Sequence, residues 1–107
     1  MKQEIVVYET QDGKLPFWEW LRGLKDRKGR VVIQARIERV RLGNFGNCRS
    51  VGNGVQELKI YYGPGYRVYF GRDGSNIVIL LCGGDKSDQK KDIVFAKELW
   101  REYKNAS

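Results

Sequence analysis

Histidine is absent from the sequence, and cysteine is scarce. Without histidine, the chain cannot use a histidine general base, a Ser-His-Asp triad or a histidine-containing metal site. The two cysteines, Cys48 and Cys82, are too few for a four-cysteine zinc site, and we expect free thiols rather than a disulfide. The composition therefore predicts a protein without a bound metal or cofactor.

Long hydrophobic runs are missing as well. No apolar stretch approaches the roughly 20 residues of a membrane-spanning helix, and residues 1–4 lead into a strand-like segment without the apolar region of a signal peptide. We expect a cytoplasmic protein with no membrane partner. The 107 residues are 41% hydrophobic, and neither a repeat nor a linker divides them, so they suit one domain over residues 1–107.

Positive charge is plentiful, since 20 lysines and arginines against 13 acidic residues give a net charge of +7. A small domain with this charge attracts polyanions, and nucleic acid is the leading class of partner. Residues 22–41 concentrate the charge, with eight basic side chains against Asp26 and Glu38. Two interpretations stay open for this cluster: a solvated helix face, or a surface for an anionic partner.

The first third of the chain predicts a strand and a helix. Residues 5–8 are β-branched and aromatic, which is typical of a strand, and a turn follows over residues 11–13. A helix is expected to begin at Pro16. Its buried face consists of Phe17, Trp20, Leu21 and Leu24. Trp18 lies off this face, either as a second packing contact or as an exposed anchor for a protein partner.

A second helix is expected from about residue 30 to residue 42, between Gly29 and a capping Gly43. One apolar stripe on this helix consists of Ile33, Ile37 and Val40. A second stripe on the opposite side consists of Val31, Ala35 and Leu42. Two stripes predict a helix packed between two neighbours, with arginines emerging between the stripes.

The second half of the chain is rich in strands. A short strand is expected over residues 48–51, and a meander over residues 55–62, 66–71 and 77–82. A last helix begins near Ser87 as its N-cap. The buried face of that helix consists of Ile93, Ala96, Leu99, Trp100 and Tyr103. The predicted order is β-α-α-β-β-β-β-α, an α+β domain with a mainly antiparallel twisted sheet and helices packed on it.

Strand alternation points to a candidate site on one face of the meander. Leu58 and Ile60 suit the core, as do Val68 and Phe70 on the next strand. The side chains expected on the other, solvent-facing side are Glu57, Lys59, Tyr61, Arg67 and Tyr69. Lys86 follows the central strand and could reach the rim of this surface.

Such a surface suits RNA, although a solvated sheet face is the simpler interpretation. Lysine and arginine bind phosphate and stabilise a pentacoordinate transition state, while tyrosine rings stack on unpaired bases. Without histidine or a metal, cleavage would use the RNA 2′-hydroxyl as nucleophile. The general base would be Glu57, Lys59 or a tyrosine whose pKa is lowered by basic neighbours. The expected ends are a 2′,3′-cyclic phosphate and a 5′-hydroxyl.

Two segments resemble a known family. Residues 54–70, GVQELKIYYGPGYRVYF, look like the central hairpin of the RelE/HigB toxin superfamily, and most closely that of its addiction module killer, or phage-derived Gp49-like HigB, subgroup. Residues 77–89 are similar to the second signature of that subgroup, which ends in G-G-D-K-S-x-Q, and Asp92, Ile93 and Ala96 continue it. The resemblance covers roughly the second half of the chain.

The resemblance implies a RelE-like, microbial-RNase-type fold and a type II toxin that cleaves mRNA on the ribosome without a metal. It implies a helix-turn-helix antitoxin as partner, beside ribosome and mRNA. Arg67, Lys59 and Lys86 match catalytic basic positions of the superfamily, with Glu57 as a further catalytic candidate. Candidate RNA-binding residues are Tyr61, Tyr69 and Arg49. Candidate antitoxin contacts are Arg36, Arg39 and Trp18.

The sequence departs from the superfamily pattern at three points. Glu57 stands where other RelE proteins have a lysine, Asp92 falls near the place of a C-terminal tyrosine, and the histidines of some HigB proteins are absent. The general base therefore stays open. Three alternatives also stay open: a ParE-like gyrase-inhibiting toxin, a non-catalytic basic module that binds nucleic acid, and an inactive prophage remnant.

Overall fold

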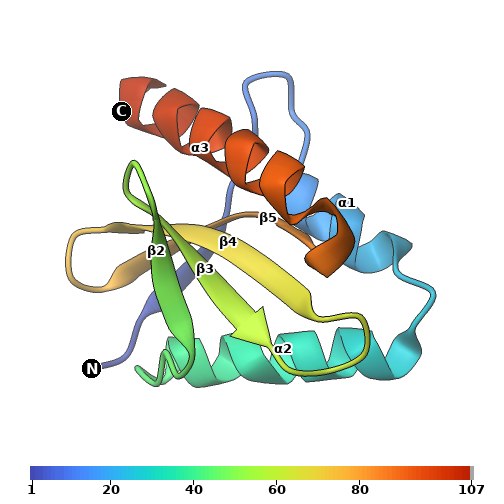
Figure 1. The fold of residues 1–107 in the computed structure, drawn as a ribbon. Helices are drawn as coiled ribbons and strands as arrows, with labels where there is room; N and C mark the ends of the chain where they lie inside the picture. The colour runs from blue at the N-terminus through green and yellow to red at the C-terminus, as the bar shows by residue number, and fades with distance from the viewer. Residues whose placement is uncertain (107) are drawn as a thin grey trace.

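The computed structural model describes residues 1–106, which form one five-stranded sheet with helices on both faces (Figure 1). In chain order the elements are β1 Glu4–Val7, α1 Pro16–Gly23, α2 Arg27–Arg41, β2 Cys48–Gly52, β3 Val55–Ile60, β4 Tyr66–Asp73, β5 Ile77–Gly84, the 3₁₀ turn η1 Lys86–Asp88 and α3 Gln89–Ala106. The α+β class is confirmed. None of the helices within residues 1–106 combines the length and hydrophobicity that a membrane span requires.

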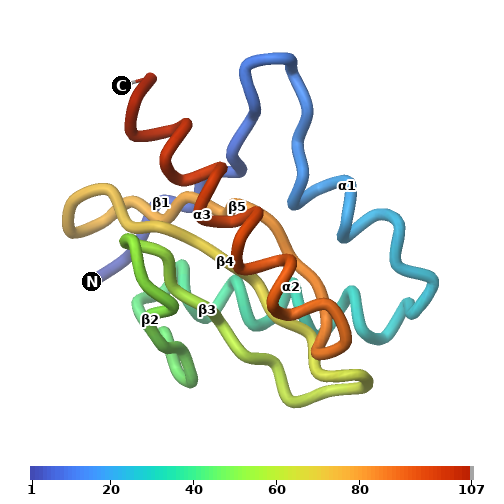
Figure 2. The backbone as a smooth tube through the Cα atoms, turned by 45° about the horizontal axis from the view of Figure 1, so that its top comes forward, coloured from blue at the N-terminus to red at the C-terminus, as the bar shows by residue number. Residues whose placement is uncertain are grey.

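The sheet has the strand order β1-β5-β4-β3-β2 and is mainly antiparallel, as predicted. Its exception is β1, which pairs parallel to β5 with Glu4 opposite Ile77. Figure 2 shows these two segments side by side although they are far apart in the sequence. The alternation argument did not predict this pairing, because periodicity within a strand carries no information about its neighbour.

The sheet separates two hydrophobic cores. Helices α2 and α3 lie on opposite faces (Figure 1), and the Phe17 and Leu21 side chains of α1 join the core on the α2 face. On the other face, the Ala96, Leu99 and Trp100 side chains of α3 pack on the sheet, as predicted. Strand β5 contributes to both cores and is therefore covered on both sides, which explains its continuous apolar run. Cys48 on β2 and Cys82 on β5 are free thiols.

The structure corrects three details of the helices. Helix α2 begins at Arg27, not near residue 30, because the Asp26 side chain caps it by accepting a hydrogen bond from the Gly29 backbone amide. Its second apolar stripe is exposed, with Val31 64% and Leu42 53% accessible, so the prediction of a helix packed between two neighbours is wrong. Ser87 is not the N-cap of α3: Asp85 caps η1 instead, and α3 begins at Gln89.

Gly83 is required where α1 crosses β5. A Cβ atom there would overlap the Trp20 ring, which packs against the strand. We expect Gly83→Ala to lower the free energy of unfolding by about 1–3 kcal/mol, because the added methyl forces a packed ring to move. Gly23→Ala is the matched control, since no atom lies within 4 Å of the Cβ it would add. Urea denaturation measures both, and equal midpoints would show that α1 does not pack as described.

Candidate functional site

A buried carboxylate organises the face of the sheet beneath α3. Glu57 on β3 is 1% exposed and stands opposite Tyr69 on β4. Its Oε1 accepts a hydrogen bond from Arg49 Nε at 2.9 Å, and its Oε2 accepts one from the Tyr69 hydroxyl at 3.0 Å. Gln89, at the start of α3, donates from Nε2 to Oε2 at 2.8 Å. Glu57 thus joins β2, β4 and α3 through hydrogen bonds to one side chain.

Arg67 is held beside this carboxylate. The residue stands opposite Lys59 across the β3–β4 pair and is 4% exposed. Its Nε lies 3.7 Å from Glu57 Oε2 and has no hydrogen-bond partner within residues 1–106. Its Nη1 donates to the Gly65 carbonyl at 2.6 Å. The Arg67 guanidinium is therefore fixed between the Glu57 carboxylate on β3 and the turn that precedes β4.

Lys86 completes a row of cations. Arg67 stands opposite Gly84 at the end of β5, and Lys86 opens η1 two residues later with an exposed side chain. Gly65 lies between the two cations: a Cβ on it would be 3.1 Å from Arg67 Nη1 and 3.7 Å from Lys86 Cβ. Lys59, Arg67 and Lys86 thus follow one another across the ends of β3, β4 and β5.

Burial and hydrogen bonding set the protonation of the buried pair. Burial alone raises the pKa of Glu57, but the hydrogen bonds from Arg49, Gln89 and Tyr69 outweigh it, so the pKa lies below its ordinary value. Burial raises the pKa of Tyr69, and its hydrogen bond to Glu57 raises it further. The site therefore contains an ionised carboxylate and a neutral phenol, and the expectation of a tyrosine with a lowered pKa is wrong for Tyr69.

The predicted register is confirmed, but the predicted solvent exposure is wrong for three residues. Glu57 pairs with Tyr69 and Lys59 with Arg67, so these side chains share a face as expected. Glu57, Arg67 and Tyr69 are buried, because the first turn of α3 covers that face and Gln89 reaches down to Glu57. Lys59 is half-buried and Lys86 exposed. The accessible part of the site is thus its rim.

The candidate RNA-binding residues divide in the same way. The Tyr69 ring is fully buried and presents no face for stacking. Tyr61 lies just beyond the end of β3, 75% exposed, and its hydroxyl accepts a hydrogen bond from the Asn47 side chain. Lys59 Nζ is 5.2 Å from the centre of the Tyr61 ring. Arg49 is ion-paired to Glu57, yet its side chain is 62% exposed at the sheet edge.

The candidate partner-binding residues do not form one surface. Arg36 is 8% exposed, because its guanidinium turns under the loop before β2 and donates from Nη2 to the Phe45 carbonyl at 2.6 Å. The expectation that it projects toward a partner is therefore wrong. Arg39 is exposed. Trp18 is 38% exposed and lines a hollow with Ile5 and other apolar side chains of β1, α1 and α2.

Two features escaped the sequence argument. Gln89 belongs to the G-G-D-K-S-x-Q motif, and its position there was the available signal for its role at Glu57.

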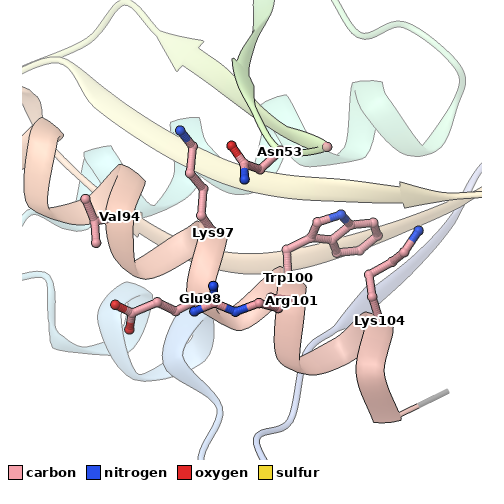
Figure 3. Close-up of a pocket in the computed structure, with 8 residues that line it drawn as sticks. Asn53, Val94, Lys97, Glu98, Trp100, Arg101 and Lys104 are labelled. Atoms are coloured by element: carbon pink, nitrogen blue, oxygen red, sulfur yellow. The ribbon is translucent and has the colours of Figure 1, made fainter.

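A hollow of about 530 Å³ between α3 and the β2–β3 turn contains none of the predicted site residues (Figure 3). It is lined by Asn53, Gly54, Val94, Lys97, Glu98, Trp100, Arg101 and Lys104. Within residues 1–106, no group of three or more Cys, Asp or Glu side chains is placed to hold a metal ion.

Comparison with known proteins gives two findings. A family model described as "Phage derived protein Gp49-like (DUF891)" matches residues 19–101, which is more than half of the chain. A protein from Haemophilus influenzae, described as uncharacterized, is 51% identical over 88 residues. Those residues make up 82% of this chain and 89% of the relative.

Proposed function

The chain belongs to the Gp49-like family of phage-derived proteins, a toxin-like family related to RelE/HigB-type toxins, and on this premise we propose that it is the toxin of a type II toxin–antitoxin system. Its proposed activity is metal-independent endonucleolytic cleavage of mRNA on the ribosome. A cognate helix-turn-helix antitoxin is its proposed inhibitor, with Trp18 and Arg39 as exposed candidate contacts.

The observation that carries this proposal is the row formed by Lys59, Arg67 and Lys86 at the ends of three neighbouring strands. Attack of a 2′-hydroxyl on phosphorus adds negative charge to the phosphoryl oxygens, and fixed cations stabilise that charge. Lys59 and Lys86, at the accessible rim, would contact the phosphate. Arg67 would act through its charge from directly beneath them, held there by Glu57 and the Gly65 carbonyl.

The proposed reaction is a transesterification. The 2′-oxygen forms a bond to phosphorus, the bond between phosphorus and the 5′-oxygen breaks, and one proton moves from the nucleophile while another reaches the leaving oxygen. Glu57 is buried and already accepts hydrogen bonds, and the pKa of Tyr69 is raised, so neither suits proton abstraction. We therefore keep Lys59 as a phosphate-binding ammonium, give Glu57 a positioning role, and assign abstraction of the 2′-hydroxyl proton to none of these side chains.

Mapping transcript ends after induction of the protein in cells tests this function. We expect cuts inside translated reading frames, with 5′-hydroxyl and 2′,3′-cyclic phosphate ends, and no cuts in a matched transcript that lacks its start codon. Intact transcripts together with DNA breaks would overturn the proposal in favour of a gyrase inhibitor. Where a small helix-turn-helix protein is encoded beside this gene, its co-expression should suppress the cuts, and undiminished cutting would remove that protein as the antitoxin.

A further inference from the structure

A cationic hollow, the α2–β3 hollow, lies where α2 meets the end of β3. Arg36 and Arg39 of α2 line one side of it, Asn47 of the loop before β2 another, and Lys59 and Tyr61 the strand end. Its volume is about 320 Å³. None of the side chains from residues 1–106 that line it is acidic. Positive charge is therefore gathered in a concave site without a carboxylate to balance it.

Arg36 is the buried part of this site. Its Nη2 is bound to the Phe45 carbonyl, and its Nη1 is buried without a hydrogen-bond partner anywhere in the described chain. A Cβ on Gly46 would overlap the guanidinium, and Gly46 has a positive φ, so glycine suits the loop that closes over Arg36. Burial lowers the pKa of Arg36, and the nearby charge of Arg39 lowers it further. An anion in the hollow would offset both unfavourable effects.

An exposed aromatic ring borders the same hollow. Tyr61 is 75% accessible, and the Asn47 side chain and the Lys59 ammonium hold it in place. Val32 also lines a neighbouring hollow along α2, which is bordered by Arg27 and Tyr62. An exposed ring beside the cations of the hollow suits a phosphate with an adjoining unpaired base. A carboxylate-bearing protein segment would engage the cations but has no need of the ring.

We propose that the α2–β3 hollow binds a backbone phosphate of single-stranded RNA, with the adjoining base stacked on Tyr61. The choice of RNA rests on the proposed function, whereas the anionic character of the occupant rests on the cations alone. Lys59 belongs both to this hollow and to the row of candidate catalytic cations. The bound phosphate would therefore neighbour the scissile one and set the register of the strand across the β3, β4 and β5 ends.

Fluorescence anisotropy of a labelled, fully 2′-O-methylated RNA oligonucleotide tests this site, because that probe can bind but cannot be cut. Arg39→Gln should weaken binding roughly tenfold, as expected for loss of a charged hydrogen bond. The salt dependence of log K should become less steep by about 0.7 for one lost phosphate contact. Tyr61→Ala should weaken binding at least about fivefold through lost stacking. Arg22→Gln is the matched control, since it removes one exposed helical arginine outside the hollow.

Equal losses of affinity in Arg39→Gln and Arg22→Gln would overturn the proposal, because net charge alone would then explain binding. Unchanged RNA affinity in Arg39→Gln, together with loss of the antitoxin complex, would also overturn it and assign the hollow to a protein partner. Cleavage is read separately with an unmodified transcript. If the parent protein binds the probe through Arg39 and Tyr61 but cuts no transcript, the proposed function fails while the binding site stands.

Discussion

Lys86→Ala is expected to lower the rate of transcript cleavage by about 10²–10³-fold, the cost of losing one charged donor to a transition-state oxyanion. Lys86 is exposed on η1 and flanks Gly65 opposite the Arg67 guanidinium, so its ammonium is the most accessible charge in the row. Because the side chain is exposed, its removal should leave thermal unfolding unchanged. A purified translation reaction, sampled over time for cleaved ends, measures the rate.

Lys90→Ala provides the control for that variant. Lys90 is also exposed and lines the same shallow hollow around η1, so its loss removes an equal charge at a neighbouring position. We expect less than about threefold change in this control, as for an exposed charge that contributes only to the general field. Equal activity of Lys86→Ala and the parent protein would remove Lys86 from the active site.

Glu57→Ala is expected to destabilise the fold by about 3–5 kcal/mol, the usual cost of removing one partner from a buried ion pair. The substitution leaves Arg67 without its carboxylate and also removes the acceptor of Tyr69 and Gln89. Gln56→Ala, in the same strand with a half-buried side chain, should cost much less. Urea denaturation gives both values, and similar midpoints would show that Glu57 does not hold β2, β4 and α3 together.

Lowering the pH should remove the stability that an ionised Glu57 contributes beyond a glutamine at this position. The folded-state pKa of Glu57 lies below its ordinary value, so its ionised form contributes stability that is complete above about pH 4.3, the usual glutamate pKa. That contribution is lost as the pH falls through the lower folded-state pKa. The difference in unfolding free energy between the parent and Glu57→Gln should therefore shrink on acidification. A difference that does not vary with pH would contradict the assignment of an ionised Glu57.

The sequence predicts this fold well wherever one residue pattern has one structural solution. Alternation placed Leu58 and Val68 in the core, and helical spacing found the Ala96 and Trp100 face of α3. Prediction from the sequence failed where one residue pattern is compatible with two structures. Val31 and Leu42 form an apolar stripe that a neighbouring helix would bury, yet no helix within residues 1–106 covers it, and such a stripe looks the same in either case.

For the candidate site, strand alternation predicts which side chains share a face but not how deeply they are buried. The cross-strand positions of Lys59 and Arg67 followed from counting residues. The burial of Glu57 and Tyr69 depends on where α3 begins and which side chain it points at the sheet, and Gln89 lies far from both along the chain. Arg36 shows the same limit, since the loop that covers it closes through Gly46 rather than through any periodic pattern.

The parallel pairing of β1 with β5 has a consequence for how the chain folds. β1 and β5 are far apart in the sequence, with β2, β3 and β4 between them, so the two ends of a very long loop must meet before the sheet is complete. Contacts this distant in sequence slow folding, because closure entropy is lost before the contact stabilises anything. The edge strand β1 is therefore expected to join β5 late in folding, after the local β3–β4 and β4–β5 hairpins have formed.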